Sequence, residues 1–259
     1  MASTLLAVLM LPLTAAVVIA LFLVMWRERR SSRDAWVAVV SGVALATWAA
    51  LAAVIASRGA FLQPDTGGAP PVGIALAALL VALAACLAIS PTLRGLLSNQ
   101  ANLTLLHLWR LVGVVFLILA AFGQMPALWA LPAGIGDILV GVSAPWVARS
   151  LDMPEGRWRA IIFNLFGMLD LIVAVGLGIT TSAGPLQVFH TTPTSELATR
   201  FPLALVPSFL VPLAFTLHVV SLWQLFGTSW VRSPEARRTE ARGVTGASGA
   251  PWRSTPQRR

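Results

Sequence analysis

Four ionisable residues lie inside long apolar stretches of the sequence: Arg110, Asp137, Asp170 and His218. Ionisable groups at membrane depth are costly, so they usually face the interior of a helix bundle and pair there or mark a ligand or proton path. The guanidinium could bind an anionic or polar group, and a carboxylate that it does not need could carry a proton. We expect Asn164 to share this pocket. A purely structural ion pair of Arg110 with one Asp is the alternative.

The stretches that hold these residues are long enough to cross a membrane. The 259 residues are 57% hydrophobic and only 11% charged, whereas a soluble domain has about 25% charged residues. A membrane-spanning helix needs about 20 mostly apolar residues. We therefore predict an all-α integral membrane protein, a seven-transmembrane-helix bundle in residues 1–226. The predicted spans are residues 5–26, 35–56, 72–89, 105–122, 127–147, 160–179 and 203–226.

The positions of the arginines predict the orientation of this bundle. Cytoplasmic loops carry an excess of basic residues. Fifteen Arg residues fall in the first, third and fifth loops and the tail, against two, Arg58 and Arg200, on the other side. This asymmetry indicates an N-terminus outside and a C-terminus in the cytoplasm. We expect the tail, residues 227–259, to be a disordered Arg-rich segment that is attracted to anionic lipid headgroups rather than to nucleic acid.

Composition excludes several classes of protein. The chain has no Lys, so it cannot hold retinal as a Schiff base. A single Cys and three His residues, without a His-Glu-x-x-His motif, give no recognisable metal site, and no Gly-rich nucleotide-binding motif is present. We therefore expect neither a metal nor a cofactor. The Arg-rich composition without Lys is typical of a GC-rich bacterial genome, so the bacterial cytoplasmic (inner) membrane is the expected location of this multi-pass protein.

Counting along the predicted helices places the ionisable residues near one another. Asp137 and Asp170 are equally far from the middle of the short loop between the fifth and sixth spans, so both carboxylates should lie at one depth. Arg110 should differ from Asp137 by about 3 Å along the axis, and His218 should lie about 9 Å nearer the cytoplasm. We expect a pocket among the fourth to seventh spans, with Asp137 pairing with Arg110 and Asp170 left as the working carboxylate. His107 is expected at the membrane interface.

Small residues and prolines accompany these positions. Gly134 and Gly167 each precede an Asp by three residues, and Gly lets neighbouring helices approach closely in lipid. Pro132, Pro207 and Pro212 each remove a backbone hydrogen bond and free a carbonyl. These carbonyls could serve a pocket, or the prolines could simply kink their helices.

Three stretches carry a resemblance to a known group of proteins. They are PAGIGDI at 132–138, NLFGMLDL at 164–171 and PSFLVP at 207–212 with His218 downstream. This pattern resembles a family of uncharacterised bacterial multi-pass membrane proteins, over about residues 105–226. The resemblance supports the choice of residues and implies no activity.

Three functions remain open from the sequence. The first is binding or proton-linked transport of a small polar or anionic molecule through the pocket. The second is an intramembrane enzyme on a lipid-like substrate, with the Asp pair as acid and base, or with His218 and carboxylates holding a metal. A haem held by His107 and His218 is a weaker variant of it. The third is an accessory membrane subunit with a purely structural polar core. The first is preferred, and no catalytic residue is assigned.

Overall fold

The computed structural model describes residues 2–63 and 68–227, and over these residues it contains helices, turns and loops but no strand. Seven helices are long and apolar enough to cross a membrane, which confirms the predicted number. The predicted tail lies, from residue 228, outside the described residues. The elements are α1 (Ala2–Glu28), α2 (Ser32–Ser57), α3 (Pro71–Ile89), α4 (Pro91–Leu96), α5 (Gln100–Leu105), η1 (Leu106–Val112), α6 (Gly113–Ala121), α7 (Ala127–Ser150), α8 (Gly156–Thr181), η2 (Ser195–Thr199), η3 (Val206–Leu210) and α9 (Val211–Phe226). All five predicted site residues lie in one compact unit, residues 1–222.

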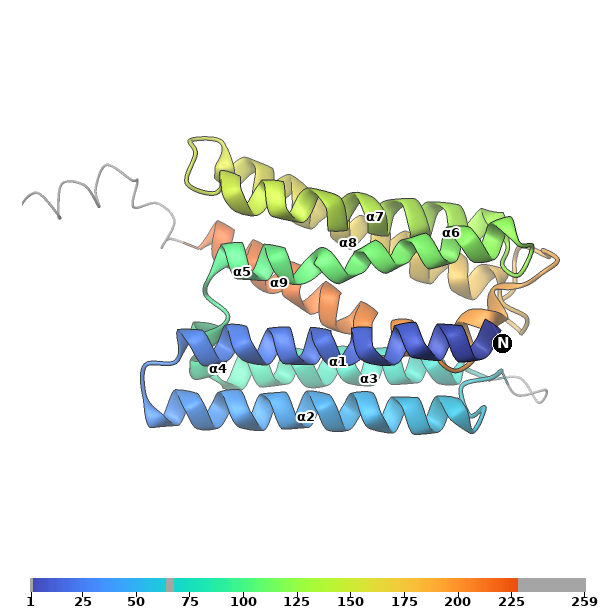
Figure 1. Ribbon diagram of the computed structural model, residues 1–259, viewed down its shortest axis with the longest axis horizontal. Coiled ribbons are helices and arrows are strands. Elements are labelled where there is room, and N and C mark those ends of the chain that lie inside the picture. The colour runs from blue at the N-terminus through green and yellow to red at the C-terminus, as the bar shows by residue number, and fades with distance from the viewer. Residues whose placement is uncertain (1, 64–67, 228–259) are drawn as a thin grey trace, which may run out of the picture. The chain divides into compact units, whose positions relative to one another are not determined.

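The first two helices form an apolar antiparallel hairpin. α1 and α2 lie side by side in Figure 1 and pack against each other. Ser31 caps α2 by accepting a hydrogen bond from the Asp34 amide, and the Asp34 carboxylate accepts one from the Ser31 amide in return. Such a reciprocal cap satisfies amides that the first helical turn leaves without partners. Most other side chains on this hairpin are apolar, because lipid and neighbouring helices surround them.

The fourth membrane span is one continuous helical segment of three parts. It begins at Gln100, five residues before the predicted start, because Asn99 caps α5 by accepting from the Asn102 amide. Between α5 and α6 the chain forms seven residues of 3₁₀ helix, η1. Runs of 3₁₀ helix longer than three or four residues are uncommon, and residues three apart eclipse one another there. Arg110 and His107 stand in this register, so their side chains share one side of the span.

Helices α6, α7 and α8 pack as antiparallel neighbours, with α7 contacting both of the others (Figure 1). Gly113 on α6 faces Gly134 on α7 so closely that a Cβ on Gly113 would come within 2.6 Å of the Gly134 carbonyl oxygen. The two backbones therefore touch at a point where neither helix has a side chain, which small residues permit in membranes. This close approach brings Asp137, one turn further along α7, against the fourth span.

The last span is also irregular, and its prolines explain why. η3 is a π-helical turn in which the Val211 amide donates to the Val206 carbonyl, five residues earlier. Pro212 has no amide proton to give to the Ser208 carbonyl. Trp48 of α2 donates its indole N–H to that carbonyl instead, at 3.1 Å. The carbonyl freed by Pro212 thus links two helices.

Candidate functional site

Arg110 holds both intramembrane carboxylates. Its Nε donates to Asp137 Oδ1 at 2.6 Å, and its Nη2 donates to Asp170 Oδ2. The Arg110 side chain is completely buried, and each carboxylate is more than nine-tenths buried. The prediction that one Asp would be left over from the pairing is therefore wrong. A guanidinium presents donors on several edges, so one Arg between two helices can serve one carboxylate from each.

The third nitrogen of Arg110 determines which ring nitrogen of His218 carries the proton. Nη1 donates to the Gly167 carbonyl at 3.3 Å and lies 3.2 Å from His218 Nε2. Because guanidinium nitrogens only donate, Nε2 must accept, so the proton of this imidazole sits on Nδ1. Nδ1 lies 2.8 Å from Asn164 Oδ1, which accepts that proton's hydrogen bond. His218 thus lies in direct contact with the end of the Arg110 side chain.

Asn164 continues this network toward Gln100, at the start of the fourth span. Its Nδ2 donates to Ser221 Oγ at 2.8 Å and to the Ala160 carbonyl at 2.7 Å. Ser221 Oγ in turn donates to Gln100 Oε1 at 2.7 Å, and Gln100 Nε2 donates back to the Ser221 carbonyl at 3.2 Å. The side-chain hydrogen bonds from His218 through Asn164 and Ser221 to Gln100 Oε1 all run in one direction. A network in which all members are satisfied holds its side chains in a single arrangement.

Two glycines make room for the charged side chains. A Cβ on Gly136 would overlap the Asp170 carboxylate, and a Cβ on Gly167 would overlap the His218 ring while lying 3.2 Å from Arg110 Nη1. Gly134, which the sequence pattern also marked, serves helix contact instead, against Leu117 and Gly113. The glycines of the two Asp-containing motifs therefore have two separate structural roles.

His107 was expected at the membrane interface, and this prediction is wrong. Its ring is 1% exposed and stacks on His218, with ring centroids 3.8 Å apart and planes 12° apart. Its Nδ1 is buried and has no hydrogen-bond partner among the described residues. The signal was present in the sequence, since a spacing of three places His107 on the same side of the span as Arg110. Two stacked rings do not present their nitrogens to one metal from opposite sides, so the geometry does not favour a haem held between them.

The cluster has more negative than positive charge when both carboxylates are ionised. Arg110 carries one positive charge against two from Asp137 and Asp170, and His218 accepts from Arg110 as a neutral imidazole. A lone buried charge in a membrane helix costs about 2.5–3.5 kcal/mol on insertion scales. The cluster is therefore short of one positive charge. Among the described residues no three His, Cys, Asp or Glu side chains are grouped so that they could hold a metal ion.

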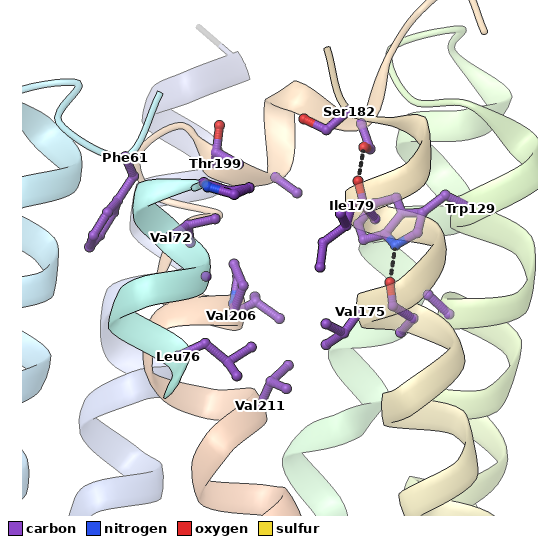
Figure 2. Close-up of a pocket in the computed structure, with 18 of the residues that line it drawn as sticks. Phe61, Val72, Leu76, Trp129, Val175, Ile179, Ser182, Thr199, Val206 and Val211 are labelled. Carbon is purple, nitrogen blue, oxygen red and sulfur yellow. Dashed lines mark hydrogen bonds between the residues drawn. The ribbon is translucent and has the colours of Figure 1, made fainter. Parts of the chain in front are cut away.

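A cavity of about 120 Å³ reaches this cluster from one end of the bundle. It runs between α3 on one side and α8 on the other, as Figure 2 shows, with Val72 and Leu76 facing Val175 and Ile179. The loop around Ser182 and η2 line the end of the cavity that is farthest from the cluster, and Asp137 lies ten residues into α7. That distance corresponds to about 15 Å of helix. Asp137 is therefore reached by the cavity while its other side is held by Arg110.

The cavity differs from the pocket that the sequence predicted. The third span contributes Val72, Gly73 and Leu76 to its wall, together with Pro70 just before it, although only the fourth to seventh spans were expected to take part. Arg110, His218, Asp170 and Asn164 do not line it. Of the five predicted site residues, all of which the network brings together, Asp137 is the one that meets the cavity. No sequence signal marked the wall, because an apolar α3 looks the same whether it faces lipid or a cavity.

One comparison with known proteins gives a result for this region. A family model, Domain of unknown function (DUF8737), matches residues 69–226. The chain belongs to this family. No curated protein and no solved structure matches it.

The bounds of the DUF8737 match agree with the bounds of the site. The matched residues include α3 and all helices from α4 to α9, and they leave out α1 and α2. Every residue of the charged cluster and nearly all of the cavity wall thus belong to the DUF8737 region, with Phe61 and Gln63 as the exceptions. The match therefore includes the third span, which lies before the region of about residues 105–226 over which the sequence resemblance was noted.

Proposed function

We propose that this DUF8737 protein binds a small molecule at the cluster of Arg110, Asp137, Asp170 and His218, and transports it in exchange for a proton. The observation that carries the proposal is the double role of Asp137, which accepts from Arg110 and also lines the cavity. A buried ion pair that served packing alone would have no reason to meet an open space.

The charge of the cluster supports the link to a proton. With both carboxylates ionised the cluster has a charge of −1, and one proton brings it to zero. A ligand that balances the same charge would replace that proton, because each lowers the free energy of the same buried charge. Binding of ligand and release of a proton are then one equilibrium.

The hydrogen-bond network supports a route through the cavity for both the ligand and the proton. Between His218 and Gln100 the network passes through the Asn164 amide. An amide has no side-chain proton that it releases readily, unlike a hydroxyl or imidazole. The network therefore holds His218 in place without relaying protons toward Gln100. Proton and ligand both reach Asp137 through the cavity.

The orientation in the membrane follows from the arginines. We propose that the protein lies in a bacterial cytoplasmic membrane with its N-terminus outside, so that the cavity opens to the outer side. Fifteen Arg residues against two support this orientation. Reporter fusions after residue 190 and at the C-terminus should report opposite sides, and two reports from one side would contradict it.

The proton link can be tested in proteoliposomes that contain a pH-sensitive dye. Three probes with the same apolar body are added outside in turn: phenylbutylamine, phenylbutanol and phenylbutyrate. We expect one of them to change the lumenal pH faster with the wild-type protein than with Asp137→Asn or Asp170→Asn, each of which leaves a balanced ion pair. Asp152→Asn, on the exposed turn between α7 and α8, is the matched control and should behave as wild type. Identical traces for all four proteins with every probe would contradict the proposed function.

A further inference from the structure

The wall of the cavity is mostly apolar, which sets the body of the ligand. Its middle part is formed by aliphatic side chains of α3, α8 and the start of α9, among them Leu76, Val175, Ile179 and Val211 (Figure 2). At about 10–15 Å³ for each water-sized group, the cavity has room for roughly ten such groups. An apolar molecule of that size gains free energy by leaving water for this space. The body of the ligand is therefore hydrocarbon-like.

Four side-chain hydrogen-bond donors on this wall are already engaged, whereas the hydroxyl of Ser182, on the loop after α8, donates to none of the described residues. Trp129 donates its indole N–H to the Ala174 carbonyl at 2.7 Å, and Ser195 Oγ donates to the Gly178 carbonyl at 2.7 Å. Thr199 Oγ1 and Gln63 Nε2 likewise donate to backbone carbonyls. An anionic ligand would need donors that these groups cannot give without breaking their own hydrogen bonds.

Arg110 does not supply the missing donors. Each of its three nitrogens already has a partner, and the side chain is completely buried behind Asp137. An anion that reached it would have to displace a carboxylate and would raise the negative charge of the cluster. The sequence-based expectation of an anionic ligand therefore finds no support in this geometry.

The end of the cavity instead offers an acceptor. Asp137 is the charged residue among those that line it. Only its Oδ1 accepts from Arg110, and Oδ2 accepts no hydrogen bond from the described residues. Phe116 and Trp129 also line the cavity, and their ring centroids lie 5.1 Å apart. Aromatic faces attract cations and not anions.

We infer that the ligand is a lipophilic amine, with its apolar body between α3 and α8 and its ammonium group donating to Asp137. This inference rests on the proposed function, since it takes the cluster as the ligand site, and it adds the chemical class. The ammonium supplies the one positive charge that the cluster lacks, and so takes the place of the proton.

Binding of the three probes to the full chain in nanodiscs, measured by calorimetry, tests this class. We expect phenylbutylamine to bind more tightly than phenylbutanol, and phenylbutyrate to bind most weakly. Asp137→Asn should weaken binding of the amine by roughly 10-fold to 100-fold, the range for one hydrogen bond to a charged group. Its binding of phenylbutanol should stay unchanged, which shows that the variant is folded.

Asp170→Asn is the matched control for charge. It removes the same charge and the same kind of Arg110 partner, but Asp170 does not line the cavity. It should weaken binding of the amine less than Asp137→Asn does. Equal losses in the two variants would overturn direct contact with Asp137.

The remaining outcomes separate the inference from the function. Val175→Trp fills the cavity and should abolish binding of every probe. If phenylbutanol or phenylbutyrate binds more tightly than phenylbutylamine, and Val175→Trp abolishes that binding, the ligand is not an amine. The proposed site would then still be supported. If Val175→Trp changes the binding of none of the probes, the cavity is not the ligand site, and the inference and the proposed function both fail.

Discussion

The hairpin of α1 and α2 and the helices from α5 to α9 differ in the polarity of their interiors. Polar side-chain contacts inside the hairpin are few: the buried Thr14 bonds back to its own helix, and the half-buried Trp48 makes a single link to η3. The second region buries a connected network from Asp137 to Gln100, with a guanidinium at its centre. The DUF8737 match leaves out the hairpin and includes the network. The irregular spans thus hold the buried polar network, whereas the interior of α1 and α2 is almost entirely apolar.

The backbone reflects the same division. α1 and α2 run as regular α-helices, even across Pro12. The two spans that carry Arg110 and His218 contain a 3₁₀ stretch and a π turn. Such irregular turns often occur at functional sites. Here η1 aligns His107 with Arg110, and both side chains meet His218.

The difference between the two regions predicts that the largest loss of stability follows from replacing Arg110. Arg110→Met leaves two carboxylates buried without their cation, and it should lower the free energy of unfolding by about 3–5 kcal/mol. Arg200→Met removes an exposed partner of Glu196 and should cost no more than about 1 kcal/mol. Unfolding in mixed micelles with increasing SDS measures both. A loss below that of Arg200→Met would show that the cluster does not stabilise the bundle.

A smaller effect is expected at the glycine that makes room for the network. Gly167→Ala would push His218 and Arg110 apart and should destabilise by about 1–3 kcal/mol, as overpacking does. Gly176→Ala, on the same helix, is the matched control because a Cβ there meets nothing within 4 Å. It should be neutral or slightly stabilising. Equal stabilities of the two variants, in the same SDS titration, would contradict the close packing at Gly167.

The smallest effect is expected in the hairpin of α1 and α2. Trp48→Phe removes the hydrogen bond to the Ser208 carbonyl and should cost about 0.5–1 kcal/mol, as single hydrogen bonds between membrane helices do. Trp36→Phe, at an exposed position on α2, should have no measurable effect on unfolding. A loss at Trp48 as large as that at Arg110 would remove the distinction between the two regions.

Much of this arrangement could be read from the sequence because lipid imposes simple constraints. Apolar length determined the number of spans, and the cost of buried charge singled out Arg110, Asp137, Asp170 and His218. Counting residues from the α7–α8 turn gave equal depth to the two carboxylates, and one guanidinium holds both. Both carboxylates stand on long α-helices, α7 and α8, so the count placed them close enough to share one partner.

The rest could not be predicted because it depends on irregular backbone and on neighbours distant in sequence. The burial of His107 follows from the start of the fourth span at Gln100 and from the 3₁₀ register of η1, neither of which the apolar pattern indicates. The reach of a guanidinium to two helices at once depends on the room left at Gly136 and Gly167. The part that α3 plays in the cavity is set by packing against η3, which its apolar sequence does not encode.

The exchange of ligand and proton at Asp137 is tested most directly by counting protons. Calorimetry of phenylbutylamine binding in two buffers of different ionisation enthalpy gives the number of protons released per bound amine. We expect about one for the wild-type protein, since the ammonium and the proton balance the same charge. Asp137→Asn and Asp170→Asn should release none, because each leaves Arg110 with a single carboxylate. Release of no proton by the wild type, or equal release by all three proteins, would contradict a site shared by the proton and the ligand.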